Sequence, residues 1–183
     1  IELSHVFFDL LFSFRGHRDF LAVGVIGLLR HEIGDAHGLL ALREFHRRRP
    51  DTPLHLFGDP TVQVPFPATN HGGMTPAALA ALYNTCTAGL ALSFTNVSLV
   101  PDELLACGVI PVVGDNPYAR GGLDHPHVRW AAQTPGALAD ALTAVVDGDR
   151  PAPHEVSAGI DPRPWDDAQR TTVRTIENEV YGD

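Results

Sequence analysis

The spacing of apolar residues predicts a helix followed by a strand where the chain first becomes clearly patterned. In the run GLLALREFH, which starts at Gly38, apolar side chains recur every three or four positions, and three arginines follow where cations favour a helix C-terminus. Pro50 stops this helix. Residues 54–58 then alternate leucine with other residues and predict a short strand. The turn-rich segment from there to Thr75 is predicted as a connection.

Further helices and strands alternate along the rest of the chain. Thr75 and Thr134 each precede a proline, and a threonine N-cap followed by proline at the first helical position opens a helix. The runs AGLALSF and VIPVVGD are apolar throughout, as strands buried on both faces are. Between them, PDELLACG predicts a helix that ends at Gly108. A short strand is expected near Trp130, and a last amphipathic helix over 165–181.

This order of elements predicts an α/β fold, a Rossmann-like parallel sheet with helices on both faces. We assign residues 38–183 to that domain. Residues 1–37 contain two dense apolar runs without a clear period, and two interpretations stay open for them: part of the first strand region, or the remnant of a preceding domain. Because residue 1 is Ile and not Met, we expect a fragment, a processed product or an incomplete sequence.

Composition and charge narrow the range of partners. The 183-residue chain has a formal net charge of −9, which repels nucleic-acid phosphates, so no nucleic-acid partner is expected. Cys86 and Cys107 lie in apolar runs, which predicts buried free thiols and a cytoplasmic protein. The histidines are scattered and no metal site is expected. The basic cluster 46–49 is interpreted as a solvated helix end; the alternative is peripheral contact with the inner face of a membrane.

The loop before Pro101 is the most informative candidate site. In an open parallel sheet, ligands bind beyond the carboxyl ends of the strands. This loop delivers backbone N–H groups and hydroxyls to a helix N-terminus, which is an anion-binding arrangement. Glu103, in the first helical turn, can accept two hydrogen bonds from a ribose diol. The alternative is that Asp102 and Glu103 only complement the helix dipole.

The stretch 82–113, LYNTCTAGLALSFTNVSLVPDELLACGVIPVV, resembles the donor-binding core of family 4 GT-B glycosyltransferases. Its ELLACG–PVV section is the specific part, although one extra residue stands between Gly108 and Pro111. The TN-x-S form of the loop is similar to the rhamnosyltransferase branch. The match extends over about residues 38–181 and implies the C-terminal, nucleotide-sugar-binding half of a GT-B fold.

The resemblance implies how the donor is held. Glu103 matches the second glutamate of the family's E-x7-E motif, which binds the donor ribose. Ser98, Leu99 and Val100 fall where a hydroxyl and backbone amides meet the donor diphosphate. No residue is assigned to catalysis.

The resemblance is less complete at the rest of the donor site. The first glutamate of the motif falls at Thr95, so contact with the donor sugar is expected at Thr95 or Asn96. Gly73 and Met74 match the loop that borders the nucleobase. The family's basic residue for the diphosphate has no clear counterpart in residues 30–38. Candidates to replace it are Arg30, His31 and His37.

The resemblance implies a retaining transferase that moves a hexose, with rhamnose as one option, from a nucleotide diphosphate sugar to a glycan or glycolipid acceptor. An N-terminal domain outside this sequence would hold the acceptor. No metal or other cofactor is expected, since amides and a basic residue can stabilise the leaving diphosphate. The alternative, favoured by Thr95 and the missing acceptor domain, is a non-catalytic α/β module that binds a nucleotide or a partner chain.

Overall fold

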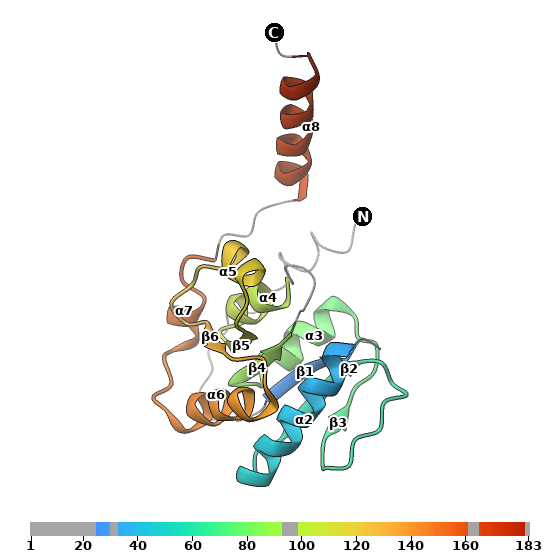
Figure 1. The fold of residues 1–183 in the computed structure, drawn as a ribbon, viewed down its shortest axis with the longest axis vertical. Helices are drawn as coiled ribbons and strands as arrows, with labels where there is room; N and C mark the ends of the chain where they lie inside the picture. The colour runs from blue at the N-terminus through green and yellow to red at the C-terminus, as the bar shows by residue number, and fades with distance from the viewer. Residues whose placement is uncertain (1–24, 30–32, 93–98, 161–164, 182–183) are drawn as a thin grey trace.

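The computed structural model describes residues 25–29, 33–92, 99–160 and 165–181, and a parallel sheet lies at its centre (Figure 1). The sheet has six strands in the order β3-β2-β1-β4-β5-β6, and every neighbouring pair is parallel. The predicted Rossmann-like parallel sheet is therefore confirmed. The strands are β1 (Val25–Leu29), β2 (Leu54–Gly58), β3 (Thr69–Asn70), β4 (Ala88–Ala91), β5 (Ile110–Gly114) and β6 (Arg129–Ala131).

Helices cover both faces of the sheet, as β4 shows. A Cβ placed on Gly89 would meet Leu104 of α4 (Val100–Ala106), whereas the next residue, Leu90, lies against Gly38 of α2 (Ile33–Arg48). Successive side chains of a strand point to opposite faces, so α4 and α2 lie on opposite sides. The helix α6 (Pro135–Asp147) packs beside α2, and α3 (Pro76–Tyr83) lies on the α4 side (Figure 1).

The predicted helix boundaries follow from local capping. Thr75 accepts a hydrogen bond from the Ala78 amide at 3.3 Å, and Thr134 accepts one from the Ala137 amide at the same distance. At the end of α4, Gly108 has a φ of +73°, which an L side chain rarely adopts. Both predicted helix starts and the predicted glycine stop are confirmed.

Three short elements were not predicted by the sequence analysis. They are β3, α5 (Pro117–Gly122) and α7 (Pro153–Val156). The helix α2 also begins earlier than the predicted start at Gly38, at Ile33. Short elements carry too few apolar positions to show a period, which explains why the pattern missed them.

The N-terminal region joins the sheet through β1. This strand lies between β2 and β4, at the centre of the sheet. Of the two interpretations of residues 1–37, the described part fits the first strand region. Residues 1–24 lie outside the described residues, and the division of the chain at residue 37 stays a prediction.

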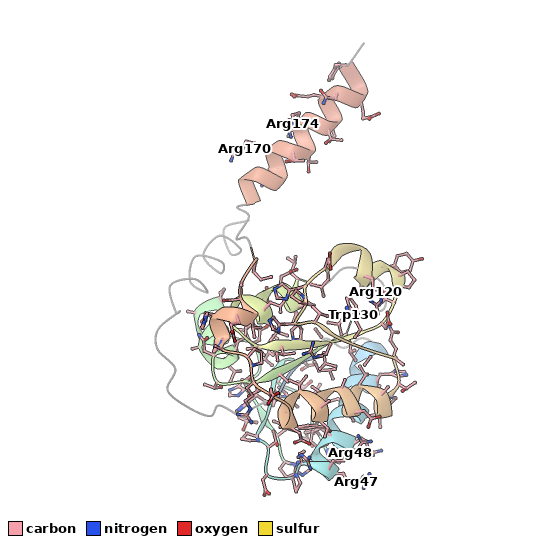
Figure 2. All side chains as sticks on the ribbon, turned by 90° about the vertical axis from the view of Figure 1, so that its left-hand side faces the viewer. Arg47, Arg48, Arg120, Trp130, Arg170 and Arg174 are labelled. Atoms are coloured by element: carbon pink, nitrogen blue, oxygen red, sulfur yellow. The ribbon has the colours of Figure 1, made fainter. Side chains whose placement is uncertain are left out.

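The last helix, α8 (Trp165–Tyr181), stands away from the sheet in both views (Figures 1 and 2). Its side chains from residue 169 onward are exposed, including those of Val173, Ile176 and Val180. The predicted amphipathic helix is confirmed, and the expected crossing to another domain stays a prediction. Over the described residues, we find no helix with the length and apolar character that spanning a bilayer requires.

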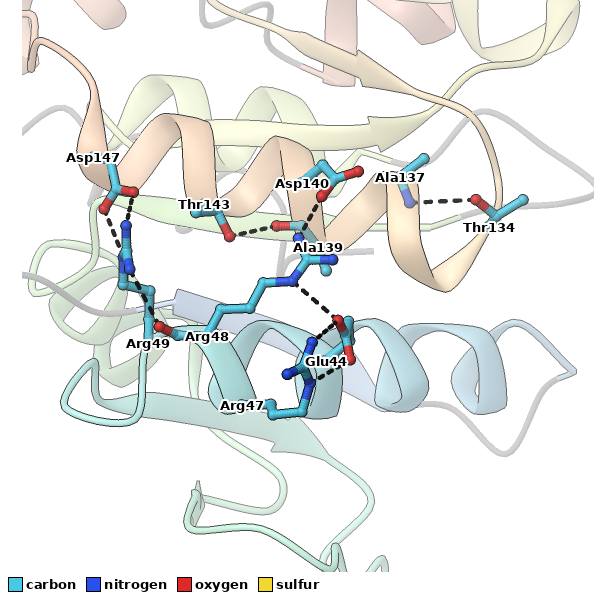
Figure 3. Close-up of polar contacts among 10 residues, drawn as sticks. All are labelled: Glu44, Arg47, Arg48, Arg49, Thr134, Ala137, Ala139, Asp140, Thr143 and Asp147. Atoms are coloured by element: carbon cyan, nitrogen blue, oxygen red, sulfur yellow. Dashed lines mark hydrogen bonds and ion pairs between the residues drawn. The ribbon is translucent and has the colours of Figure 1, made fainter.

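The arginines at the end of α2 form ion pairs with acids of α2 and α6 (Figure 3). Arg47 and Arg48 both donate to Glu44, whose pKa is lowered to about 2, chiefly by the hydrogen bond from Arg47. Arg48 also reaches Asp140, and Arg49 pairs with Asp147 through its Nε at 2.7 Å. Because acids of α2 and α6 pair with these cations, this end of α2 favours the solvated-helix-end interpretation over a lipid-binding patch.

Candidate functional site

The strand order reverses between β1 and β4, and this point defines the candidate site. In doubly wound sheets, the crevice outside the carboxyl ends of the two strands at such a switch point binds the ligand. Here β1 and β4 are neighbours in the middle of the sheet, and α4 follows the carboxyl end of β4. The described start of α4, at Leu99 and Val100, therefore belongs to the edge where this fold binds ligands.

Several predicted site residues lie outside the described residues. They are Thr95, Asn96 and Ser98, which follow β4 in the sequence, and Arg30 and His31, which follow β1. Their expected contacts with the donor sugar and diphosphate stay predictions.

The described start of α4 contains the other predicted diphosphate contacts. Leu99 is the N-cap residue and is 51% exposed, whereas Val100 is buried. Leu99 offers no side-chain cap, but its carbonyl accepts from the Glu103 amide at 3.0 Å. Leu104 is fully buried and anchors this short helix over β4. The start of α4 is therefore fixed to the core directly beside the switch point.

Glu103 is half-buried and its carboxylate lies against α3. The Tyr83 hydroxyl donates to Glu103 Oε2 at 3.4 Å. Tyr83 is completely buried, and its pKa is raised, first by burial and then by the negative charge of Glu103. Phe57 meets the tyrosine ring edge-on, with centroids 5.9 Å apart. Glu103 therefore has a defined partner in addition to its position in the first turn of α4.

Asp102, the second acid of this turn, has a different environment. It is about half-buried, and desolvation raises its pKa, while the charge of His125 acts in the opposite direction. His125 belongs to the loop between α5 and β6, and its Nε2 donates to the Ala158 carbonyl at 2.9 Å. The two neighbouring acids therefore interact with different parts of the molecule, although both complement the α4 dipole.

Gly73 and Met74, the predicted nucleobase residues, follow the edge strand β3. The Asn70 side chain shapes this loop, since it donates to the Asp59 carbonyl at 3.0 Å and accepts from the Gly72 amide at 2.9 Å. Gly73 is exposed with open space at its Cβ position, and Met74 packs partly against the core. Strands β2 and β1 lie between β3 and β4, so this loop and α4 approach the carboxyl edge from separate positions.

The sequence analysis missed a fixed cation beyond the carboxyl end of β5. Arg120 of α5 pairs with Asp115 through two hydrogen bonds of 2.6 and 2.8 Å and lies 4.6 Å from the centroid of the Trp130 ring (Figure 2). This pairing lowers the pKa of Asp115. The signal that could have found α5 is Asn116 followed by proline, because Asn116 caps the helix as Thr75 caps α3.

Histidine pairs occur in the structure without forming a metal cluster. His55 Nδ1 lies 3.1 Å from His71 Nε2, beside β3. Across the ranges that the structure describes, no group of three or more His, Cys, Asp or Glu side chains could hold a metal ion. The expectation that no metal takes part stays a prediction.

Comparison with known proteins gives one curated relative and several solved structures. The chain is 41% identical over 83 residues to the O-antigen biosynthesis protein RfbC of Myxococcus xanthus, which is 44% of this chain and 6% of that protein. No family model matches the chain.

The solved structures cover nearly the whole chain at low identity. Trehalose-6-phosphate synthase OtsA has a TM-score of 0.64 with 13% identity over 84% of this chain. The pneumococcal O-GlcNAc transferase GtfA, solved with UDP and GlcNAc, has a TM-score of 0.57 with 15% identity over 90%. The UDP-GlcNAc 2-epimerase of Neisseria meningitidis has a TM-score of 0.57 with 14% identity over 92%.

These likenesses establish the fold. The chain has the Rossmann-like architecture found in GT-B glycosyltransferases, which agrees with the resemblance seen in the sequence. It spans 44%, 37% and 48% of the three solved chains, respectively. At this identity the fold alone is shared, and neither the family 4 assignment nor the rhamnosyltransferase branch is tested.

Proposed function

We propose that this chain is the donor-binding domain of a glycosyltransferase that works in the synthesis of a surface polysaccharide. The observation that carries the proposal is the 41% identity to an O-antigen biosynthesis protein over 83 residues. A Rossmann-like sheet whose strand order reverses between β1 and β4 supports it, because this arrangement binds nucleotides in many proteins. The solved glycosyltransferases with the same fold support it further.

The proposed donor is a nucleotide diphosphate sugar held across the carboxyl edge of the sheet. Glu103 accepts hydrogen bonds from the ribose, and the diphosphate contacts Ser98, Leu99 and Val100. Gly73 and Met74 border the nucleobase. As the glycosidic bond breaks, charge gathers on the diphosphate, and amides at the start of α4 stabilise it without a metal.

The transferred hexose and its acceptor belong to the same proposal. Thr95 and Asn96 contact the sugar, for which rhamnose is one candidate, and anomeric configuration is retained. A second domain presents the glycan or glycolipid acceptor, and α8 reaches toward that domain. The enzyme works in the cytoplasm, where it meets the inner face of the membrane if its acceptor is a glycolipid.

Isothermal titration calorimetry with UDP, TDP, ADP and GDP tests the proposal. We expect at least one nucleotide to bind the wild-type chain, and Glu103→Ala to weaken a ribonucleotide about 10-fold or more, since a hydrogen bond to a charged group contributes about 1.5–3 kcal/mol. Asp102→Ala is the matched control, because it removes an acid from the same helical turn. Absence of binding by all four nucleotides would overturn the proposal.

A second candidate function is supported by the epimerase likeness. The UDP-GlcNAc 2-epimerase of Neisseria meningitidis was solved with UDP-GlcNAc, and this chain overlays on it over 92% of its length. A protein of this fold can therefore bind a nucleotide sugar without transferring the sugar, as can a non-catalytic module. Nucleotide binding with no transfer, even after a donor sugar and the acceptor domain are supplied, would favour this alternative over a transferase.

A further inference from the structure

We propose that Tyr83 is a positioning residue that holds the Glu103 carboxylate in place for the donor ribose. The inference rests on the proposed function, because it concerns the same nucleotide site. It goes beyond that function by giving a role to a core residue of α3 that touches no ligand itself. The carrying observation is the contact between the Tyr83 hydroxyl and Glu103 Oε2 at 3.4 Å.

The tyrosine ring forms a rigid support. Tyr83 ends α3 and has no exposed surface, and the ring of Phe57 meets it at 81°. The Cys86 amide donates to the Tyr83 carbonyl at 2.8 Å, which fixes the backbone as well. A side chain enclosed in this way keeps one rotamer, so its hydroxyl has a fixed position relative to α4.

The hydroxyl itself requires an acceptor. A buried hydroxyl without a hydrogen bond is costly, and in the part of the chain that the structure describes its partner is Glu103. Burial and the nearby carboxylate raise the pKa of Tyr83, so the hydroxyl stays protonated and donates. The contact is longer than the usual 2.5–3.0 Å of an O–H···O bond, and hydrogen bonds in ligand sites often shorten when the ligand binds.

A carboxylate that accepts a hydrogen bond from Tyr83 can still bind a diol. An ionised carboxylate has about four acceptor positions, so a bond from Tyr83 leaves capacity for two ribose hydroxyls. Glu103 is only half-buried, so part of its side chain is exposed. Without the tyrosine hydroxyl, the flexible glutamate must be ordered by the ligand itself, which lowers affinity for nucleotides that carry the diol.

The test compares a ribonucleoside diphosphate with its 2′,3′-dideoxy analogue, using whichever of UDP, ADP and GDP the wild-type chain binds. We expect Tyr83→Phe, which keeps the ring, to weaken the ribonucleotide about 10-fold and to leave the dideoxy analogue unchanged within about 2-fold. A purely structural role would weaken both ligands equally. Tyr181→Phe, at the exposed end of α8, is the matched control.

The same comparison of two ligands separates this inference from the proposed function. In a Glu103→Gln background, Tyr83→Phe should have no further effect on the ratio of the two affinities. If the wild-type chain binds a ribonucleotide but Tyr83→Phe leaves that ratio unchanged, the inference fails while the proposed function stands. If no ribonucleotide binds, the proposed ribose site fails and the inference fails with it.

A second measurement keeps Tyr83 in place and covers the case in which Tyr83→Phe does not fold. The chain contains three tyrosines, so 3-fluorotyrosine labelling gives three ¹⁹F resonances, assigned with Tyr118→Phe and Tyr181→Phe. We expect the ribonucleotide to shift the Tyr83 resonance and the dideoxy analogue to shift it much less. Equal shifts with both ligands, or none with either, would overturn the inference.

Discussion

Replacing Gly89 with alanine should destabilise the protein, because the new methyl group would overlap the side chain of Leu104. Gly89 lies in the central strand β4, and a Cβ at this position would be 2.5 Å from Leu104 Cδ1 and 2.7 Å from Cδ2. Carbon atoms in contact normally stay about 3.5–4.0 Å apart, so the leucine or the whole of α4 must move by about 1 Å. Leu104 is fully buried, which leaves it little room to adjust.

The expected magnitudes follow from this overlap. Overpacking of a core typically costs about 1–3 kcal/mol, so Gly89→Ala should lower the free energy of unfolding by that amount. Leu104→Ala leaves a cavity instead and should cost about 2–5 kcal/mol. The double variant places the new methyl group in the space that the leucine leaves. The double variant should therefore lose less unfolding free energy than the sum of the two single variants, by about 0.5–3 kcal/mol.

Urea denaturation followed by circular dichroism measures all three variants. Gly136→Ala is the matched control, because a Cβ on this glycine of α6 meets nothing within 4 Å. We expect the control to be neutral or slightly stabilising, as alanine favours a helix. Additive losses, within about 0.5 kcal/mol, would refute the reasoning, since they would mean that residue 89 and Leu104 do not share one space.

Two further predictions concern the end of α4 and the β2–β3 edge. Gly108→Ala should destabilise the fold by about 1–3 kcal/mol, because the residue has a positive φ and its Cβ would lie 2.5 Å from that of Pro153. Thermal unfolding measures this loss, and a variant as stable as the wild type would contradict the prediction. Burial and the charge of His71 lower the pKa of His55, so the folded state binds fewer protons and stability should fall as pH falls below about 6.5. His55→Gln should reduce this dependence of the unfolding free energy on pH, measured by urea denaturation between about pH 7.5 and 5.5. An unchanged dependence would exclude His55 as its source.

The sequence was sufficient for the order of the long elements because each carries a strong local signal. Thr75 and Thr134 cap their helices as predicted, and β4 and β5 are buried along their full length, as their apolar runs indicated. The predicted buried free cysteines, Cys86 and Cys107, are also confirmed. Such signals depend on residues close together in the chain, so a single sequence carries them.

Elements held by distant contacts gave no comparable signal. The strand β3 contains two residues, and its place at the edge depends on pairing with β2 and on the bond from Asn70 to the Asp59 carbonyl. The central position of β1 depends on β2 and β4 on its two sides, so its apolar run alone did not distinguish a strand from a helix. Pairing partners that are far apart in sequence decide both cases.

The orientation of Glu103 shows why a motif alone does not define a site. Its position in the first turn of α4 could be read from the sequence, and that position fits both a ribose ligand and a residue that only complements the helix dipole. The contact with Tyr83 depends on α3 and α4 lying together on one face of the sheet, which follows from the crossover of the chain from β3 to β4. The contact with the tyrosine hydroxyl fits both interpretations, because a buried hydroxyl needs an acceptor whether or not that acceptor also binds a ligand. The affinity ratio between the ribonucleotide and its dideoxy analogue is therefore the quantity that decides between the two interpretations.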